Sequence, residues 1–429
     1  MTVEKAVPAW LRSRTRPRFF YGWWIVVGAV VAQFVAIGMQ APVAGAFLVP
    51  MTTDLGWTRA QFAIATSLAT AISAAFGFFV GTYVDRFGAR PLMLIGGAAV
   101  GSTLIAISTV HHLWQFVLLR GVVFTLGLVL IGGLVVNVTV AKWFVEKRGW
   151  AISIASLGTS LGSIVVPPTM VWVVDQFGWR EGWIALGIGA WVLVLPAALM
   201  MRRQPEDHGL LPDGAVEGDE RSAAALERGR EDMARSFTRA AAVRTRAMWL
   251  LVVAFGLADI GLIAVLFHHI PFLTDAGFSR TQASVLFATI GIAAFISKFG
   301  WGWSMQRFPP RTLAAVSFVV TGTAGAMMVP AAAALSMPAV AVASAAWGAG
   351  VGGLLPLQEF VWASFFGRRH LGAVRSAALP VALFFGAAGP IGAGLYRDVV
   401  GSYDGALLTF ATLSLAAAVL VLGARPPEP

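Results

Sequence analysis

Cysteine is absent from this 429-residue chain, so the protein can form no disulfide, bind no metal through thiolates and use no cysteine nucleophile. Charge is also scarce. Asp, Glu, Lys and Arg make up 12% of the residues, whereas hydrophobic residues make up 58%. A typical soluble domain carries about twice that share of charged residues. The composition therefore indicates a membrane protein.

Motifs for nucleotide and acyl chemistry are missing as well. The chain has no glycine-rich phosphate loop ending in Lys-Ser or Lys-Thr, so ATP is not its expected energy source. Its serine and histidine residues do not form the pattern of a catalytic triad. His268 and His269 are adjacent on a helix, so their rings diverge, and no third metal ligand is evident. We therefore expect no enzyme, no bound metal and no cofactor.

Long apolar runs are what the chain has instead. Each is about 20 residues long, enough to cross a hydrocarbon core of about 30 Å as a helix. We predict an all-α polytopic membrane protein with twelve transmembrane helices, at about 23–50, 60–83, 91–110, 114–138, 151–173, 183–201, 248–272, 283–305, 312–332, 337–361, 372–396 and 404–423. They form two six-helix bundles, at 1–201 and 247–429.

A polar stretch at 202–246 separates the two bundles and is predicted to be a cytoplasmic linker. Asp, Glu, Gly and Pro dominate its first part, as in flexible connections. From Ala223 to Arg246, the abundance of Ala, Arg and Glu favours a helix along the cytoplasmic surface. A regulatory segment and a plain tether both fit this pattern, and we favour the tether.

The net charge of +10 is placed so that it defines an orientation. With the N-terminus on the cytoplasmic side, most of the 31 Lys and Arg residues face the cytoplasm. Those on the opposite side are Arg59, Arg180, Arg280 and Arg397. This positive-inside distribution predicts a cell (inner) membrane protein with both termini cytoplasmic. A basic arm at 12–18 then faces an anionic leaflet, and we expect no nucleic-acid partner.

The two halves of the chain repeat each other at an offset of 221 residues. The segment 56–61, Gly-Trp-Thr-Arg-Ala-Gln, returns at 277–282 as Gly-Phe-Ser-Arg-Thr-Gln. Gly81, Arg86, Phe87 and Arg90 return as Gly302, Arg307, Phe308 and Arg311. Weak matches kept in order over half a chain indicate a duplication. Two pseudo-symmetric bundles around a central seam are an architecture for moving a solute across a bilayer.

Between the second and third predicted spans stands Gly81-Thr82-Tyr83-Val84-Asp85-Arg86-Phe87-Gly88-Ala89-Arg90. This segment resembles the signature loop of the major facilitator superfamily and matches it at every charged and glycine position. The resemblance implies an alternating-access transporter whose cytoplasmic gate contains Gly81, Asp85, Arg86, Gly88 and Arg90. Asp85 can accept hydrogen bonds from a neighbouring helix N-terminus or from an arginine. In the second copy Arg307 and Arg311 remain, but Gln306 replaces the acid, which predicts a weaker gate.

Further motifs narrow the resemblance. They are Tyr21-Gly22-Trp23-Trp24, Asp54-Leu55-Gly56-Trp57-Thr58-Arg59, Trp143-Phe144 with Lys147-Arg148-Gly149, His268-His269-Ile270-Pro271 with Asp275-Ala276-Gly277, and Gly389-Pro390. Together, over most of the chain, they resemble the monocarboxylate transporters and the bacterial oxalate/formate antiporter-like proteins. The acidic residue that animal members carry at the first motif is missing here. The resemblance implies that the substrate is a small carboxylate.

Lys298 is the residue that we expect to bind this substrate. It lies nine residues before Arg307, roughly 13 Å inside the cytoplasmic end of the eighth span. A charged side chain there costs about 2.5–3.5 kcal/mol, so it must face protein or a water-filled cavity. Members of the family that the chain resembles hold the carboxylate with a basic residue on this helix, usually arginine. A structural ion pair or a snorkelling side chain is the alternative.

Asp259, in the seventh span, is the expected counter-charge at a similar depth. An anion that arrives at Lys298 would let Asp259 take up a proton, which would couple uptake to a proton gradient. A static Asp259–Lys298 ion pair that serves assembly fits the sequence equally well.

Four other polar residues are weaker candidates. His268 lies half a helical turn out of phase with Asp259, so a straight helix cannot aim both inward. The family resemblance favours His268 on the substrate side. Arg120 resembles the embedded arginine of the family's fourth helix, with either a proton relay or structural pairing as its role. Asn137 and Gln358 are related by the offset of 221 and either line a vestibule or only pack.

Two charged residues near the cytoplasmic side are assigned to structure. We expect Glu359 to pair with Arg368, Arg369 or the basic residues of 302–311. Arg375 is interpreted as a residue of the positive-inside distribution.

These patterns predict a monomeric secondary transporter that moves a small carboxylate by proton symport or anion exchange. One alternative is an efflux pump for apolar or cationic compounds, which would need a buried acid but no buried cation. The other is a membrane receptor that keeps the fold without transport, since fold alone does not define function.

Overall fold

The structure is a computed structural model that describes residues 19–216 and 220–427. Within these residues every regular element is a helix. The predicted basic arm at 12–18 lies outside the described residues. Ten described helices are long and apolar enough to cross a membrane, and the α1–α2 pair and α3 complete the predicted twelve spans.

The N-terminal bundle contains the first six spans. Its helices are α1 (Gly22–Gly38), α2 (Ala41–Leu55), α3 (Arg59–Phe87), α4 (Ala89–Ile107), the fourth span made of α5 (Leu113–Phe116), η2 (Val117–Val123), α6 (Phe124–Ile131) and α7 (Gly133–Trp143), then α8 (Arg148–Phe177) and α9 (Trp179–Met200).

The C-terminal bundle contains the other six spans. Its helices are α12 (Arg246–Asp275), α13 (Arg280–Ser304), α14 (Pro310–Ala333), α15 (Met337–Phe366), α16 (Leu371–Val400) and α17 (Asp404–Gly423). The predicted ranges agree with these helices to within a few residues.

The repeated hexapeptides are helix starts. Thr58 caps α3 by accepting from the Gln61 N–H, and the Gln61 side chain accepts from the Thr58 N–H in return. Ser279 and Gln282 make the same capping box at the start of α13. Since each box satisfies two backbone donors that a helix end leaves free, the repeat is conserved between the bundles for a local reason.

Two spans are interrupted, which the sequence did not indicate. The first span breaks between α1 and α2 at Met39 and Gln40. The fourth span contains the π-helical turns of η2 and breaks at Gly132, whose ψ of 179° is extended. Both breaks are in the N-terminal bundle, so the two bundles are only approximately equivalent.

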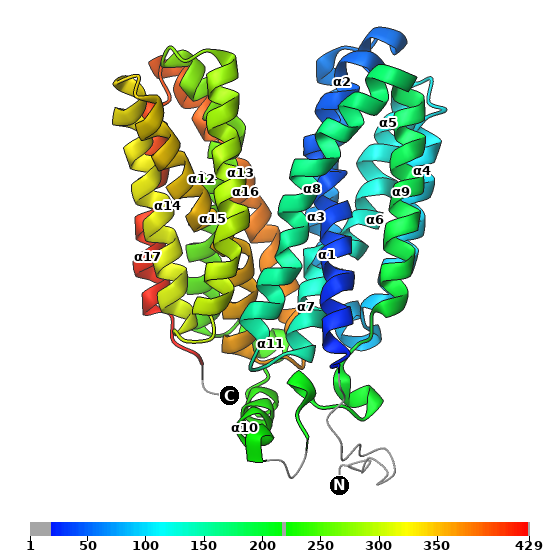
Figure 1. Cartoon of the computed structure of the whole chain (residues 1–429), viewed down its shortest axis with the longest axis vertical. Coiled ribbons are helices and arrows are strands. Elements are labelled where there is room, and N and C mark those ends of the chain that lie inside the picture. The colour runs from blue at the N-terminus through cyan, green and yellow to red at the C-terminus, as the bar shows by residue number, and fades with distance from the viewer. Residues whose placement is uncertain (1–18, 217–219, 428–429) are drawn as a thin grey trace.

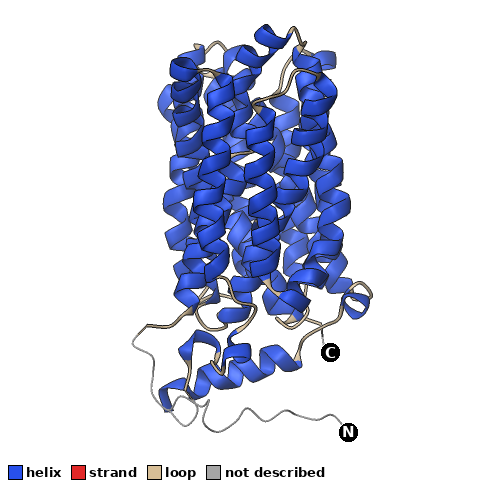
Figure 2. Cartoon of the chain, turned by 90° about the vertical axis from the view of Figure 1, so that its right-hand side faces the viewer, coloured by secondary structure: helices blue, strands red, loops and turns tan. Residues whose placement is uncertain are grey.

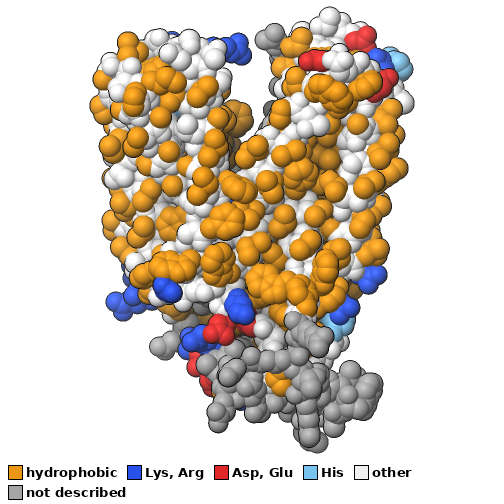
Figure 3. Space-filling view, viewed as in Figure 1, with side chains coloured by type: hydrophobic (Ala, Val, Ile, Leu, Met, Phe, Trp, Pro, Cys, Tyr) orange, Lys and Arg blue, Asp and Glu red, His pale blue; other side chains and the backbone are white. Residues whose placement is uncertain are grey.

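The bundles lie side by side and meet at one end of the molecule (Figure 1). This end carries both chain ends and the connecting segment, and we call it the linker end. At the opposite end the molecular surface is hollowed between the bundles, as Figure 3 shows. Apolar side chains cover the flanks, whereas most of the visible Lys and Arg side chains gather at the linker end.

Two helix pairs form the contact between the bundles. We call the contact of α3 with α16 the first seam and the contact of α8 with α13 the second seam. The offset of 221 residues relates α3 to α13 and links residues of α8 to residues of α16. The two seams are therefore pseudo-symmetric copies of each other, which makes their differences informative.

The linker contains four short helices below the bundles (Figure 2). They are η3 (Pro205–His208), η4 (Pro212–Gly214), α10 (Glu220–Ala234) and α11 (Arg239–Ala242). The helix that we expected from Ala223 to Arg246 is thus split, and α10 begins and ends earlier than predicted.

Candidate functional site

The first seam is built on two glycines in direct contact. A methyl group at Gly81 on α3 would overlap the carbonyl oxygen of Gly372 on α16, and a methyl group at Gly372 would overlap the carbonyl oxygen of Gly81. Only glycine at both positions allows the backbones to approach this closely. The role expected for Gly81, close helix contact, thus has a specific partner.

Asp85 joins both bundles at the base of the first seam. Its carboxylate accepts from the backbone N–H groups of Gly372 at 3.2 Å and Ala373 at 2.8 Å, in the first turn of α16. It also accepts from Lys142 Nζ at 2.7 Å. An anion at a helix N-terminus is favoured by the helix dipole. The cation beside Asp85 is Lys142, which we did not identify from the sequence.

The other residues of the signature loop shape its turn. Gly88 has a φ of 81°, a conformation that favours glycine, and it begins α4. Arg86 and Arg90 make no ion pair with a described residue. They line an open cleft of about 530 Å³ that also contains the linker residues Arg203 and Asp207. Arg86 and Arg90 therefore do not bridge the bundles in this conformation.

In the part of the chain that the structure describes, the second seam has no acid at the position that corresponds to Asp85. A methyl group at Gly302 would lie 3.0 Å from Ser153 Cβ on α8, which is tight but not an overlap. The guanidinium of Arg307 lies 4.1 Å from the Trp303 ring of its own helix end. Neither Arg307 nor Arg311 forms an ion pair with a described residue, and Gln306 is exposed. The repeated loop therefore does not tie the bundles together.

Lys298 instead crosses the second seam. Its ammonium group extends from α13 to α8 of the N-terminal bundle, and only 3% of the residue is exposed. Nζ donates to three neutral oxygens, at 2.6 Å to the Ser156 carbonyl, 2.9 Å to Thr159 Oγ1 and 2.8 Å to Ser160 Oγ. No described carboxylate lies within ion-pair distance of it. The hydroxyl groups of Thr159 and Ser160 were not predicted as part of the site.

The predicted Asp259–Lys298 ion pair is absent. Asp259 is partly exposed and has no hydrogen bond or ion pair with a described residue. Because Asp259 is on α12, outside both seams, its depth alone could not show which helix it faces.

Glu359 and Arg375 form a buried ion pair between α15 and α16, with Nε 3.3 Å from Oε1. This corrects the expectations that Glu359 pairs with Arg368, Arg369 or the 302–311 loop and that Arg375 is only a positive-inside residue. Glu359 Oε2 and Arg375 NH1 are buried without a hydrogen-bond partner among the described residues. The pair is therefore incompletely satisfied.

Asn137 and Gln358 are buried but not equivalent in their contacts. Asn137 accepts from Gln33 Nε2 of α1 at 3.2 Å. Gln358 makes no hydrogen bond with a described residue. Asn137 thus pairs within the N-terminal bundle, and its repeat-related partner Gln358 does not make the equivalent contact.

His268 lies apart from Lys298. Its ring nitrogens are 3.3 Å from Tyr403 Oη and 3.1 Å from the Pro390 carbonyl oxygen, both in the C-terminal bundle near the end opposite the linker. His269 points to Ser344 on α15 at 3.0 Å. The structure therefore does not bring His268 into one site with Lys298.

Arg120 has no acidic partner among the described residues. Its NH2 donates to the Met39 carbonyl at 3.3 Å, where α1 breaks, and its guanidinium lies 4.0 Å from the Phe124 ring. Of the two roles predicted for Arg120, the ion pair is absent. The side chain instead holds the broken first span against the π-helical fourth span.

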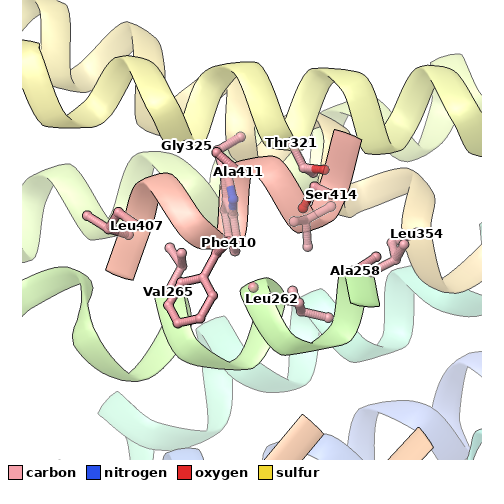
Figure 4. A pocket seen from close by; sticks show the side chains of 13 residues that line it. Ala258, Leu262, Val265, Thr321, Gly325, Leu354, Leu407, Phe410, Ala411 and Ser414 are labelled. Atoms are coloured by element: carbon pink, nitrogen blue, oxygen red, sulfur yellow. The ribbon is translucent and has the colours of Figure 1, made fainter. Parts of the chain in front are cut away.

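One enclosed cavity lies inside the C-terminal bundle, among α12, α14, α15 and α17 (Figure 4). Its volume of about 20 Å³ has room for one or two water molecules. The lining is apolar apart from Thr321 and Ser414, and it contains neither Lys298 nor Asp259. We interpret this cavity as a packing gap.

The fold has twelve spans in two pseudo-symmetric bundles, a seam with two touching glycines, and a signature loop whose Asp85 caps a helix of the other bundle. These features define a polytopic membrane transporter of the alternating-access class. The family model of the Major Facilitator Superfamily matches residues 29–390. The chain belongs to this superfamily, whose members are transporters and not enzymes.

Relatives at the level of sequence include several kinds of transporter. The MFS-type transporter pytF of Aspergillus terreus is 24% identical over 65% of this chain and 87% of its own length. Monocarboxylate transporter 9 of Mus musculus is 28% identical over 34% of this chain and 28% of its own length. The riboflavin transporter MCH5 of Saccharomyces cerevisiae is 30% identical over 27% of this chain and 20% of its own length.

Solved structures share the fold at low identity. The proton:xylose symporter XylE superposes with a TM-score of 0.74 over 96% of each chain, at 12% identity. The human organic anion transporter MFSD10 superposes with a TM-score of 0.70 over 94% of this chain and 100% of its own, at 15% identity. These matches establish the twelve-helix fold and no substrate.

Proposed function

We propose that this transporter moves a small carboxylate, monocarboxylate or short dicarboxylate, which binds at Lys298 between the two bundles. One observation carries the proposal. A buried ammonium group crosses the second seam and is held only by a carbonyl and two hydroxyl groups. Neutral oxygens satisfy its hydrogen bonds but do not balance its charge, and an unpaired charge at membrane depth is costly.

A carboxylate would remove this imbalance. It offers lone pairs to Nζ in place of those of Thr159 and Ser160, and it brings the opposite charge that these neutral oxygens lack. The ammonium presents a point charge and no bidentate fork, so it would select for charge and tolerate different acid shapes. The partial similarity to a monocarboxylate transporter supports the same substrate class.

Alternating access follows from the two ends of the molecule. The bundles are joined at the linker end and separated at the opposite end (Figures 1 and 3). We propose that the linker end is cytoplasmic in the cell (inner) membrane, since the positive-inside pattern supports this, and that the transporter acts as a monomer. The conformation is then open to the outside, with 1–201 and 247–429 as the moving units.

Asp259 is the proposed proton-coupling residue. It is partly exposed and lacks a partner among the described residues, so a proton can reach it without breaking an ion pair. Because Lys298 does not pair with it, the two residues would be coupled through the movement of the C-terminal bundle and not through direct contact. Proton symport would then depend on Asp259, whereas anion exchange would not.

The test is uptake of labelled mono- and dicarboxylates into liposomes that contain the wild type, Lys298→Ala or Asp259→Asn, with and without an inward proton gradient. We expect saturable uptake that Lys298→Ala reduces at least about a hundredfold. If Asp259→Asn removes the response to the gradient but keeps exchange, transport is proton-coupled. Uptake that is indifferent to Lys298, or no uptake of any acid, would favour efflux or a receptor role and contradict the proposal.

A further inference from the structure

The linker contacts both bundles through one carboxylate. Asp232 on α10 accepts three hydrogen bonds at 3.1 Å from Arg148 at the start of α8, one from NH1 and two from NH2. It also lies 3.5 Å from Nε of Arg368, in the loop between α15 and α16. The side chains of Arg148, Arg368 and Asp232 are only 3%, 4% and 11% exposed. Asp232 therefore faces two buried cations, one from each bundle, and Arg368 also pairs with Glu206 of the linker and donates to the Lys142 carbonyl.

A second linker residue reaches across the first seam. Arg239 on α11 donates to the Phe78 carbonyl at 3.0 Å and to Thr82 Oγ1 at 2.9 Å, both on α3. On α16 it donates to the Ala373 carbonyl at 2.9 Å and to Ser376 Oγ at 3.0 Å. These contacts flank the touching pair Gly81 and Gly372. Burial lowers the pKa of Arg239, and the charge of Asp85 opposes this effect.

The first part of the linker contacts the N-terminal bundle alone. Asp213 accepts from three successive backbone N–H groups, those of Val145, Glu146 and Lys147, at 2.8 to 3.0 Å. This loop leads into α8, the pseudo-symmetric partner of the helix that Asp85 caps. The linker thus places an acid before the start of α8 and stays attached there.

We propose that Asp232 and Arg239 are positioning residues of the transport gate, which hold both bundles in the conformation that is closed at the linker end. The linker must release at least one bundle before that end can open. This extends the signature-loop gate to the connecting segment, and it replaces our sequence-based interpretation of the linker as a plain tether.

The physical reason is geometric. When the bundles separate at the linker end, Arg148 and Arg368 move apart, and one carboxylate cannot stay with both. If Asp232 stays with Arg368, which also pairs with Glu206, the buried guanidinium of Arg148 loses its carboxylate, which is strongly unfavourable. Arg239 would lose its acceptors on one of the two helices, α3 or α16. Opening therefore requires breaking contacts that a flexible tether would not make.

The absence of cysteine makes this directly testable. A single cysteine in place of Ser153 would report on the second seam, since Ser153 is 1% exposed in this conformation and its hydroxyl has no partner among the described residues. The rate at which a hydrophilic maleimide labels Ser153→Cys in the purified full-length protein measures how often the linker end opens. This readout needs no knowledge of the substrate.

The test variants are Asp232→Asn and Arg239→Gln, each in the Ser153→Cys background. The matched control is Asp207→Asn, which breaks an ion pair of the same chemistry within the linker, Arg203 with Asp207 at 2.7 Å. Its hydrogen bond with Arg203 holds the pKa of Asp207 below its usual value, so this pair is charged throughout the labelling range of pH 6 to 8.

We expect Asp232→Asn and Arg239→Gln each to raise the labelling rate about tenfold and Asp207→Asn to change it less than about twofold. Gel filtration and thermal melting establish that each variant is folded. Arg239→Lys keeps the charge but cannot reach four acceptors, so it should give an intermediate rate. Equal labelling rates in the folded test variants and the control would overturn the proposal.

Discussion

The two seams descend from one repeated design but are held together differently. In the first seam, Gly81 and Gly372 touch, and Asp85 joins a lysine to a helix N-terminus. In the second seam, Gly302 leaves more room, the acid is replaced by Gln306, and Lys298 crosses without a described carboxylate. Within the spans, the acid of the first seam is paired with Lys142, whereas Lys298 of the second seam faces no described carboxylate. Arg239 of the linker adds a cation at the linker end of the first seam.

This difference separates two tasks that a symmetric transporter would have to share. A seam whose charges are already paired stabilises one conformation and gains nothing from an added anion. A seam with an unpaired cation is a place where an added anion changes the energy. The comparison is the reason why we propose closure as the task of the first seam and anion binding as the task of the second.

The ion pair behind the first seam should give the largest effect. Arg375 on α16 pairs with Glu359, whereas Ile154 and Val138 occupy the repeat-related positions behind the second seam. Glu359→Gln would leave a buried guanidinium unpaired and lower the free energy of unfolding by about 3–5 kcal/mol. Thermal melting in detergent measures this. The double variant Glu359→Val with Arg375→Ile copies the other bundle and should recover most of the loss, and failure to recover it would show that the charges themselves are needed.

Gly81 and Gly302 should respond unequally to substitution by alanine. Gly81→Ala inserts a methyl group into a backbone carbonyl of the other bundle, which should disfavour the closed linker end by about 3 kcal/mol, roughly a hundredfold. Gly302→Ala meets a side chain at 3.0 Å and should cost less than about 1 kcal/mol. Labelling of Ser153→Cys compares them, and equal effects would contradict the difference between the seams.

Asp85→Asn should have an intermediate effect. The amide keeps an acceptor for the α16 N–H groups but loses the charge that binds Lys142, so the closed end should be weakened by about 2 kcal/mol. The same labelling assay measures how much more often the linker end opens. Asp85→Glu restores the charge and serves as the control. If the Asp85→Asn variant is labelled at the same rate as the protein with Asp85, the contacts of Asp85 across the first seam do not hold the linker end closed.

Restoring the missing acid should have the smallest effect. Gln306→Asp recreates the repeated motif, but position 306 is exposed, and it is the neighbouring Met305 that packs against Gly149 in the first turn of α8. We expect the free energy of opening at the linker end, measured by labelling, and the free energy of unfolding, measured by melting, each to change by less than about 0.5 kcal/mol, as for most exposed substitutions. A large stabilisation would show that the second seam lacks strength only because it lacks this acid.

Features with a strong local pattern could be predicted from the sequence. Span positions follow from apolar length, and the helix starts at Thr58 and Ser279 follow from capping chemistry that four residues define. The signature loop predicted a carboxylate at Asp85 that accepts from a helix N-terminus. Lys298 was identified because a charge at membrane depth is rare in itself.

Features that depend on how helices face each other could not be predicted from the sequence. The partners of Glu359 and Asp259 depend on the rotation of α12, α15 and α16, which the sequence does not specify to better than a turn. The break at Met39 and the π-helical turn around Arg120 stabilise each other, and neither is visible in one segment alone. The contacts of Asp232 and Arg239 were missed because a polar, flexible composition gives no sign of docking.

The most direct test of the account is equilibrium binding of a labelled small carboxylate to the purified wild type, Lys298→Ala and Lys298→Arg. The account predicts saturable binding that Lys298→Ala weakens at least about a hundredfold and that Lys298→Arg largely keeps, since a cation at this seam is what the anion requires. Binding of equal strength to the wild type and to Lys298→Ala would show that the unpaired ammonium is a structural contact and not the substrate site.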